Sequence, residues 1–304
     1  MTQFDESKHN RHSDGKFANK PHSEADGVSL APTTPSLPPR DAEATEGNVD
    51  EFIGAAGFSD TNSWAKPHSD GELAVTFTAP DATGNSAVTF TVEPGSTMGD
   101  VYDKAATAMT MYDADEVFAY DYDPDYPQPD VDAATYLRGL QNDEAFYEAK
   151  ARELGAPPKK RPYPISVETA DHYPIRPDQF PPSEAEVTEE NINKFLTAAN
   201  LWHNNTEVLP YPDGQGYDIN VYAPNNPASR VTVHAYADDN MGDVYDKTSE
   251  VMGYDFGADE AFEKEWNDPE FQASSGLTPT RLLSMFDADQ QFFRERSRQL
   301  SNIG

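Results

Sequence analysis

The sequence predicts a mixed α+β protein, in which two tandem homologous α-β-β-α units follow a disordered N-terminal tail. Three observations support this prediction. A seven-residue motif occurs twice, apolar residues around both copies follow helical or strand spacing in turn, and a proline-rich stretch lies between the copies. The 304 residues suffice for about two domains. Aromatic residues make up 11% of the chain, more than a fully disordered acidic sequence carries, so packed cores are expected.

Residues 1–45 are polar, nearly free of large apolar side chains, and rich in proline towards their end. This composition predicts a disordered tail. Within it, the stretch from Arg11 to Leu30 resembles a short N-terminal tag on proteins of high-GC Gram-positive bacteria and of their phages and plasmids. The resemblance implies that a mobile genetic element encodes the protein, and it implies nothing about chemistry.

The repeated motif, MGDVYDK, spans Met98–Lys104 and Met241–Lys247, an offset of 143 residues. Across residues 86–104 and 229–247, ten of nineteen positions are identical, which predicts a tandem duplication and not a short-period repeat. Between the copies, prolines favour an extended linker. The predicted segments are the tail at 1–45, an acidic first unit at 46–155, the proline-rich linker at 156–187 and a second unit at 188–304.

Each unit is expected to begin with a short amphipathic helix, at Val49–Phe58 or Ile192–Leu201, because apolar residues recur there at helical spacing. Two strands follow in each unit, since segments rich in β-branched and aromatic residues flank a turn rich in Gly, Asn, Asp and Pro. The predicted strands are Leu73–Thr78, Ala87–Val92, Tyr217–Tyr222 and Val231–Tyr236.

A capped helix comes next in each unit. Thr97 precedes Asp100 by three residues, as Asn240 precedes Asp243, and this spacing is typical of a side-chain cap with an acidic residue in the first turn. Helix capping explains the acidic residues of the repeated motif better than a catalytic role does. Further helical stretches are expected at Tyr136–Leu154, Gly257–Glu270 and Leu282–Leu300.

The run from Ala87 to Val101 resembles the hairpin-to-helix passage of ubiquitin-like β-grasp proteins, in which an alternating strand ends in Val-Glu-Pro and a capped threonine opens the helix. The resemblance covers only the hairpin and the start of the helix in each unit. It implies a β-grasp-like binding module without catalysis. The later strands of a β-grasp are not recognisable in the sequence.

The chain carries 54 acidic and 22 basic residues, a formal net charge of −32, and no cysteine. The lack of cysteine excludes disulfides, zinc–thiolate sites and a cysteine nucleophile. The charge argues against direct binding to nucleic acid or to an anionic membrane, because both attract clustered Lys and Arg. No run reaches the ~18 apolar residues of a membrane span, and residues 1–11 lack the apolar core of a secretory signal, so a cytoplasmic protein is expected.

The excess of negative charge is uneven, since residues 51–150 contain 19 acidic and 4 basic residues. Within them, the acidic tract Asp113–Asp132 has no basic residue and interleaves tyrosines with carboxylates. Tyrosine offers contact area at low entropic cost, so we expect this tract to bind a partner. The predicted partner-binding residues are Asp113, Asp115, Glu116, Asp121, Asp123, Asp125, Asp130, Asp132, Tyr120, Tyr122 and Tyr126.

Three interpretations of the acidic tract are open. Its carboxylates could imitate DNA phosphates and occupy a basic groove, which requires dense and rigidly placed acids. Alternatively, Asp121, Asp123, Asp125 and Asp132 partly match an EF-hand calcium loop, although Tyr126 stands where that loop needs glycine. Finally, a charged loop can serve solubility alone.

Motifs for catalysis or cofactor binding are missing from the sequence. The seven histidines form no helical metal-binding pair, and there is neither a Gly-x-Ser-x-Gly elbow nor a glycine-rich nucleotide loop. We therefore expect no metal, no cofactor and no enzymatic activity, although scattered aspartates could converge in space as in a hydrolase.

The leading hypothesis is a non-enzymatic acidic interaction protein, encoded by a mobile element, that blocks a host nucleic-acid-binding or defence complex by DNA mimicry. Its expected partner is a protein or complex with a basic surface, and self-association into a homo-oligomer is a further option. The alternative is a ubiquitin-like adaptor or scaffold whose acidity is incidental. A halophilic origin could also explain the charge, but it predicts charge spread evenly over both units.

Overall fold

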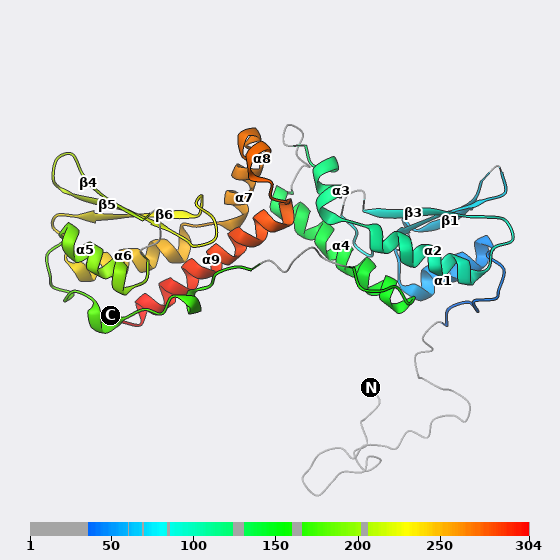
Figure 1. The fold of residues 1–304 in the computed structure, drawn as a ribbon, viewed down its shortest axis with the longest axis horizontal. Helices are drawn as coiled ribbons and strands as arrows, with labels where there is room; N and C mark the ends of the chain where they lie inside the picture. Colours follow the sequence, from blue (N-terminus) through cyan, green and yellow to red (C-terminus); the bar gives the residue numbers. More distant parts are fainter. Residues whose placement is uncertain are drawn as a thin grey trace, which may run out of the picture. The chain divides into compact units, whose positions relative to one another are not determined.

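In a computed structural model, the described part of the chain comprises residues 36–303 except 60, 69, 84–85, 124–130, 160–165 and 202–205. Here two three-stranded antiparallel sheets combine with helices in a mixed α+β fold (Figure 1), which confirms the predicted fold class. Residues 1–35, most of the predicted tail, lie outside the described residues. Within the described residues, no helix combines the length and the hydrophobicity needed to cross a membrane.

The first half of the chain forms a helix, a sheet and three further helices. Its elements are α1 (Glu46–Ala56), β1 (Trp64–Pro67), β2 (Leu73–Thr78), β3 (Ala87–Val92), α2 (Met98–Met111), α3 (Ala114–Asp121) and α4 (Ala133–Glu153). The strands lie in the order β1-β2-β3, and both neighbouring pairs are antiparallel. Helices α1 and α2 cover one face of this sheet, α1 at β1 and α2 at β3 (Figure 1).

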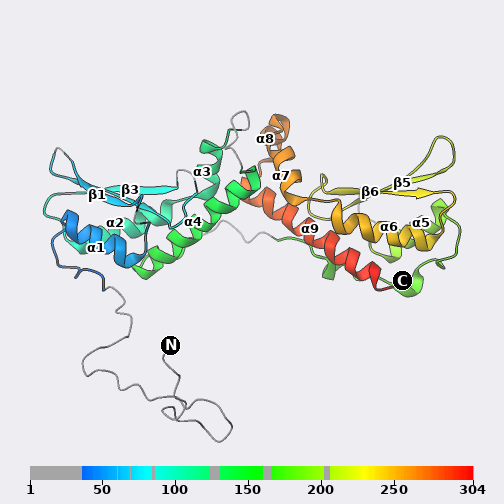
Figure 2. The ribbon, with the colours of Figure 1, turned by 180° about the vertical axis from the view of Figure 1, so that it is seen from behind.

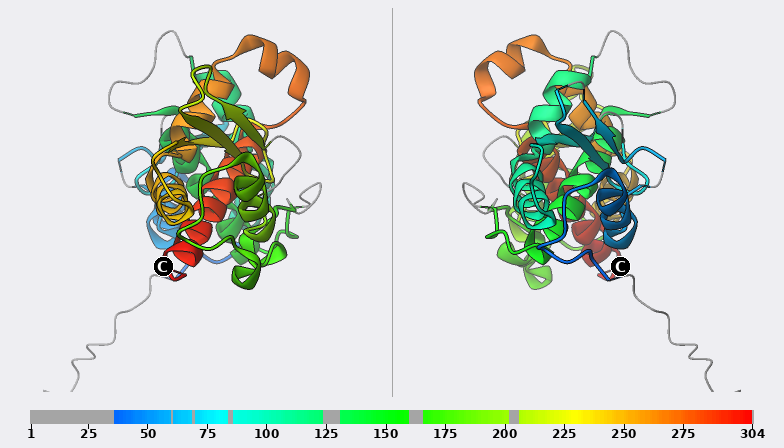
Figure 3. Two further views of the ribbon diagram at one scale, coloured as in Figure 1. Left: turned by 90° about the vertical axis from the view of Figure 1, so that its left-hand side faces the viewer. Right: turned by 90° about the vertical axis from the view of Figure 1, so that its right-hand side faces the viewer.

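The second half begins with two short 3-10 helices and then follows the same order, with one additional helix, α8, before the last one. Its elements are η2 (Ala170–His172), η3 (Pro177–Gln179), α5 (Glu189–Ala198), β4 (Glu207–Pro210), β5 (Gly216–Tyr222), β6 (Arg230–Tyr236), α6 (Met241–Tyr254), α7 (Ala258–Trp266), α8 (Pro269–Ser275) and α9 (Pro279–Ser301). The sheet has the order β4-β5-β6, again antiparallel throughout. End-on views show α1 and α2 beneath the first sheet, and α5, α6 and α9 beneath the second (Figure 3). That the halves arose by duplication stays a prediction.

Each sheet contains one strand more than the sequence predicted. The additional strands, β1 and β4, have four residues each and end in Pro67 and Pro210. Proline donates no backbone hydrogen bond, so it is confined to edge strands and weakens the sequence signal of a strand. The predicted helix Gly257–Glu270 is divided into α7 and α8, because Asp268 caps a new helix that begins with proline.

The elements after α2 and α6 differ from those that the β-grasp resemblance implies. In the described part of the chain, helices follow both, and each sheet consists of three antiparallel strands without a later one. The resemblance to β-grasp proteins stays a prediction, and it rests on the hairpin and its capped helix. The caps themselves are as predicted, since Thr97 with Asp100 and Asn240 with Asp243 form reciprocal capping boxes.

The two halves share a hydrophobic core. One continuous cluster of buried side chains joins the first sheet and its helices to residues of α7 and α9. At the junction, the ring of Phe118 on α3 lies 6.1 Å from that of Phe262 and 5.6 Å from that of Trp266, both on α7. Helix α4 contacts α7, and α3 contacts α9 (Figure 2). A second cluster fills the space under the β4-β5-β6 sheet.

A segment before the first helix of each half packs against the capped helix. Glu43 forms an isolated antiparallel bridge with Thr97, and Glu186 forms the matching bridge with Asn240. Both pairs have the offset of 143 residues found in the repeated motif. Described residues before 46 and before 188, which the sequence assigned to the tail and to the linker, thus contact the capped helices of the two halves.

Candidate protein-binding surface

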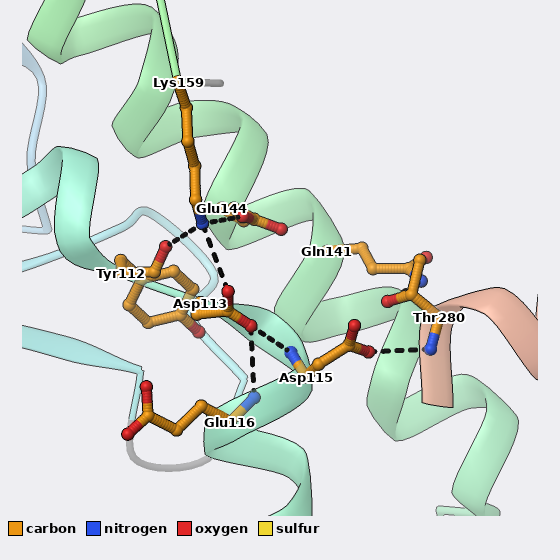
Figure 4. Close-up of polar contacts among 8 residues, drawn as sticks. All are labelled: Tyr112, Asp113, Asp115, Glu116, Gln141, Glu144, Lys159 and Thr280. Atoms are coloured by element: carbon orange, nitrogen blue, oxygen red, sulfur yellow. Dashed lines mark hydrogen bonds and ion pairs between the residues drawn. The ribbon is translucent and has the colours of Figure 1, made fainter. Parts of the chain in front are cut away.

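The first residue of the acidic tract, Asp113, has a structural role. Its carboxylate caps α3 by accepting hydrogen bonds from the backbone N–H groups of Asp115 and Glu116, at 3.0 and 3.2 Å (Figure 4). It also faces Lys159, whose Nζ lies 3.4 Å away and forms a second ion pair with Glu144 at 2.5 Å. Asp113 therefore fixes the start of a helix and the beginning of the proline-rich segment.

Asp115 connects the two halves of the chain. Its carboxylate accepts a hydrogen bond of 2.7 Å from the backbone N–H of Thr280, in the first turn of α9 (Figure 4). An acid at this position satisfies a free helix amide and interacts favourably with the helix dipole. Gln141 on α4 donates a hydrogen bond of 3.0 Å to the Thr280 hydroxyl, so two polar contacts meet at one residue.

The end of the tract is also used within the fold. Asp132 caps α4 through the N–H of Thr135 at 2.7 Å, and Asp121 accepts a hydrogen bond of 3.4 Å from the hydroxyl of Tyr136. The ring of Tyr122 stacks on Phe118, with centroids 4.9 Å apart. These three predicted contact residues are therefore part of the packing around α3 and α4.

Two of the predicted residues project outward from α3. Glu116 is exposed, and Tyr120 has 90% of its surface exposed. Asp123 is exposed and has an interaction within the chain. The remaining predicted residues, Asp125, Tyr126 and Asp130, lie outside the described residues. That the tract binds a partner stays a prediction, and in the described part Glu116, Tyr120 and Asp123 are its exposed members.

A second acidic surface lies on the helices that carry the repeated motif. Only four residues of each helix are exposed, and they occupy equivalent positions. The α2 stripe consists of Asp100, Asp103, Thr107 and Met111, and the α6 stripe consists of Asp243, Asp246, Glu250 and Tyr254. The spacing of three, four and four residues places each stripe along one helix face. Both end in a large apolar or aromatic side chain, Met111 with 74% and Tyr254 with 85% of its surface exposed.

The two stripes differ in charge, because Glu250 stands where the α2 stripe has Thr107 and because their neighbouring cations differ. Asp103 on the α2 stripe forms an ion pair of 2.5 Å with Arg40. No ion pair reaches Asp246 or Glu250 in the described part of the chain. Lys247, between them in sequence, is bound to Asp239 instead. The α6 stripe is thus the more strongly negative of the two.

The tyrosine of the repeated motif holds each helix in place. The hydroxyl of Tyr102 donates a hydrogen bond of 2.6 Å to the carbonyl of Pro38, and Tyr245 donates one of the same length to Pro181. The glycine of the motif allows a close approach of the same segment to the helix. A Cβ on Gly99 would lie 3.1 Å from the carbonyl oxygen of Arg40, which accepts the Gly99 N–H. The motif therefore attaches the segment before each half to its helix.

Two buried carboxylates were not predicted from the sequence. Asp143 on α4 accepts hydrogen bonds from the N–H of Thr83 at 2.9 Å and from the Ser86 hydroxyl at 2.6 Å. Asp289, at the matching position on α9, accepts bonds from the N–H of Asn225 and of Asn226, both at 3.0 Å. Each carboxylate thus holds the turn between the second and third strands of its sheet. The sequence signal was their shared offset of 146 residues within two matching helical stretches.

Burial raises the pKa of both carboxyls, while the hydrogen bonds that they accept lower it in part. A perturbed carboxyl can indicate a catalytic site, but it can equally serve the structure. Here the donors are backbone amides, a hydroxyl and an amide side chain, all from the turn that each carboxylate holds. The arrangement accordingly supports a structural role.

The nearest approach to a catalytic constellation lies on the open face of the second sheet. Nδ1 of His234 lies 2.6 Å from the Asp218 carboxylate and 3.2 Å from the Tyr211 hydroxyl. Burial and the neighbouring Asp218 raise the pKa of Tyr211 to about 12. In the described residues, no group of three or more His, Asp or Glu side chains could hold a metal ion.

The chain was compared with protein families, curated proteins and solved structures. Neither a family model, nor a curated protein, nor a solved structure matches the chain. The interpretation of its surfaces therefore rests on their own geometry and charge.

Proposed function

We propose that the protein is a non-enzymatic acidic interaction protein that occupies a basic surface of a nucleic-acid-binding or defence complex. The observation that carries this proposal is the α6 stripe, in which Asp243, Asp246 and Glu250 face solvent beside the exposed Tyr254. Carboxylates attract a basic surface and guide its approach, while an exposed aromatic ring supplies contact area. Glu116 and Tyr120 on α3 repeat this combination of an acid and a tyrosine.

The charge density of the α6 stripe supports partial DNA mimicry. Its three carboxylates span seven residues, about 10 Å along the helix axis, or one charge in about 5 Å. One strand of duplex DNA presents a charge about every 3.4 Å along its axis. A single stripe thus supplies roughly two thirds of the linear charge density of one DNA strand, so further acids must contribute to the field that a basic groove experiences.

The cellular setting is part of the proposal. The resemblance of residues 11–30 to a tag of mobile-element proteins favours a phage or plasmid gene, which makes a host defence complex a suitable target. The cytoplasm is the compartment in which such a target meets DNA, and a chain without cysteine is compatible with that reducing compartment.

Competition with DNA tests the proposal. The full chain is immobilised, exposed to a lysate of a high-GC Gram-positive bacterium, and washed with either duplex DNA or polyglutamate of equal total charge. We expect duplex DNA to release the bound proteins more effectively than polyglutamate, and we expect binding to fall as salt rises from about 0.1 to about 0.5 M, because the interaction is electrostatic. Retention that ignores both salt and DNA contradicts the proposal.

A further inference from the structure

The two sheets have four edges between them, and three of these edges are protected. An edge strand presents unpaired backbone N–H and C=O groups that can pair with another chain, and proteins commonly block such edges with short strands, proline or lysine. Strands β1 and β4 are both four residues long and end in proline. The outer edge of β3 is blocked by lysine, because Nζ of Lys104 donates a hydrogen bond of 3.1 Å to the carbonyl of Thr91.

The outer edge of β6 has none of these features. It is seven residues long, contains no proline and pairs in unbroken register with β5. The lysine equivalent to Lys104 is Lys247, but its Nζ is bound to the carboxylate of Asp239 and lies 4.6 Å from the ring centre of Tyr236. The first half has Ser96 at the position of Asp239, so one difference in the turn directs the lysine away from the sheet edge.

The backbone register shows which groups of β6 point outward. Ala223 donates its N–H to Ser229, and Ala237 donates its N–H to Gln215, at either end of the β5-β6 ladder. In an antiparallel pair, hydrogen-bonded positions alternate, so the odd-numbered residues of β6 bond to β5. The N–H and C=O groups of Thr232 and His234 therefore point to the open edge. In the described part of the chain, no hydrogen bond reaches these backbone groups.

We propose that the open edge of β6 pairs with β6 of a second copy of this chain, antiparallel and centred on Val233. The two sheets then join into one sheet of six strands through a two-fold axis, a closed arrangement that stops at the dimer. Thr232 of each copy pairs with His234 of the other, and the outward backbone groups of both residues are satisfied.

The side chains of β6 suit pairing with themselves. In this register, Arg230 of one copy lies opposite Tyr236 of the other, a combination that allows a cation–π contact. Strand β6 also contains one arginine, one histidine and no acid, in a chain whose net charge is −32. Pairing through β6 therefore brings two copies together along the strand of the second sheet that carries no negative charge. Added salt screens the repulsion between the remaining acidic surfaces of the two chains.

Sedimentation velocity of the full chain over a range of concentrations tests the proposal. We expect a dimer fraction that rises with protein concentration and with salt. Thr232→Pro removes an outward N–H, a change that an edge strand tolerates. It should weaken dimerisation about tenfold or more, because each dimer loses that bond on both sides of its axis. The matched control is Thr89→Pro on β3, which occupies the equivalent position and should leave dimerisation unchanged.

A second pair of variants keeps the test independent of folding defects. Arg230→Glu places an acid opposite Tyr236 and should weaken the dimer several-fold. Lys194→Glu makes the same charge change on α5, which contacts β4 at the opposite edge of the sheet, and should not. Amide exchange at Thr232 and His234 should slow as protein concentration rises. A chain that stays monomeric at high concentration and high salt overturns the proposal, and so does a dimer that survives both Thr232→Pro and Arg230→Glu.

Discussion

The two halves of the chain hold their hairpin turns in the same way but leave different sheet edges open. A buried aspartate, Asp143 or Asp289, binds the turn of each sheet. The equivalent lysines differ, since Lys104 covers the backbone of β3 and Lys247 is bound by Asp239. Residues that build the fold are thus alike in the two halves, while one residue that differs in a turn alters which backbone groups face solvent. The aspartates common to both halves serve the fold, whereas the different contacts of the two lysines affect the surface.

Removing the buried carboxylates should give the largest effects on stability. Asp289→Ala leaves backbone amides of Asn225 and Asn226 buried without an acceptor, and we expect a loss of about 3–5 kcal/mol in the free energy of unfolding. Asp143→Ala should cost about 2–3 kcal/mol, because the Ser86 hydroxyl can turn to another acceptor. Urea denaturation followed by circular dichroism measures both. Losses below about 1 kcal/mol for both variants would show that these carboxylates do not stabilise the turns.

The tyrosines of the repeated motif come next. Tyr102→Phe and Tyr245→Phe each delete one hydrogen bond to a proline carbonyl, and we expect about 1–1.5 kcal/mol for Tyr102 and less for Tyr245. The difference follows from burial, since Tyr102 is 3% exposed and Tyr245 is half-buried. Hydrogen exchange should quicken mainly in residues 40–45 for the first variant and in residues 183–188 for the second. Equal exchange in both segments would contradict a local role.

The hydroxyl of Tyr245 also predicts a dependence on alkaline pH. Burial raises its pKa from 10.0 to about 12 in the folded chain. The folded state therefore holds this proton more tightly than the unfolded state, so the contribution to stability is complete below pH 10 and is lost as the pH rises towards 12. The stability advantage of the wild type over Tyr245→Phe should fall as the pH rises above about 10, and the order of the two proteins should reverse by about pH 11.5. A constant difference over this range would show that the hydroxyl is not held in this way.

Contacts between the halves should give the smallest effects. Asp115→Asn weakens the bond to the Thr280 N–H at the start of α9, and we expect a loss of about 1 kcal/mol. Arg138 pairs with Asp259 and Asp287, each at 2.7 Å, but all three side chains are more than a third exposed. Arg138→Gln should therefore cost less than about 1 kcal/mol, since exposed ion pairs contribute little. Thermal unfolding of the two variants measures both losses. A larger loss for Arg138→Gln than for Asp115→Asn would contradict the expected order.

The sequence predicted regular elements well where a local pattern determines them. Strand β3 has the predicted bounds, Ala87–Val92, because its apolar residues alternate and a turn precedes it. Both capping boxes were predicted from spacing alone. Strand β1 was missed, since four residues that include Lys66 and Pro67 carry no strand signal until a neighbouring strand supplies the hydrogen bonds.

Surface roles were harder to predict because burial depends on tertiary contacts. Asp113 and Asp132 were expected to bind a partner, yet each precedes a helix, and the structure uses both as caps. Asp289 lies on a helix where an acid usually faces water, and only the folded chain brings the turn at Asn225 to it. The stripes on α2 and α6 became visible only once exposure was known for every residue of those helices.

The most direct measurement of the central claim compares two pairs of acids in the DNA-competition experiment. Asp246→Asn with Glu250→Gln neutralises the α6 stripe and spares the cap at Asp243. Glu184→Gln with Glu189→Gln removes the same charge from exposed positions outside the stripe. We predict that the first double variant loses most of the DNA-releasable binding and that the second retains it. Equal binding by both variants would contradict the claim that the α6 stripe contacts the partner.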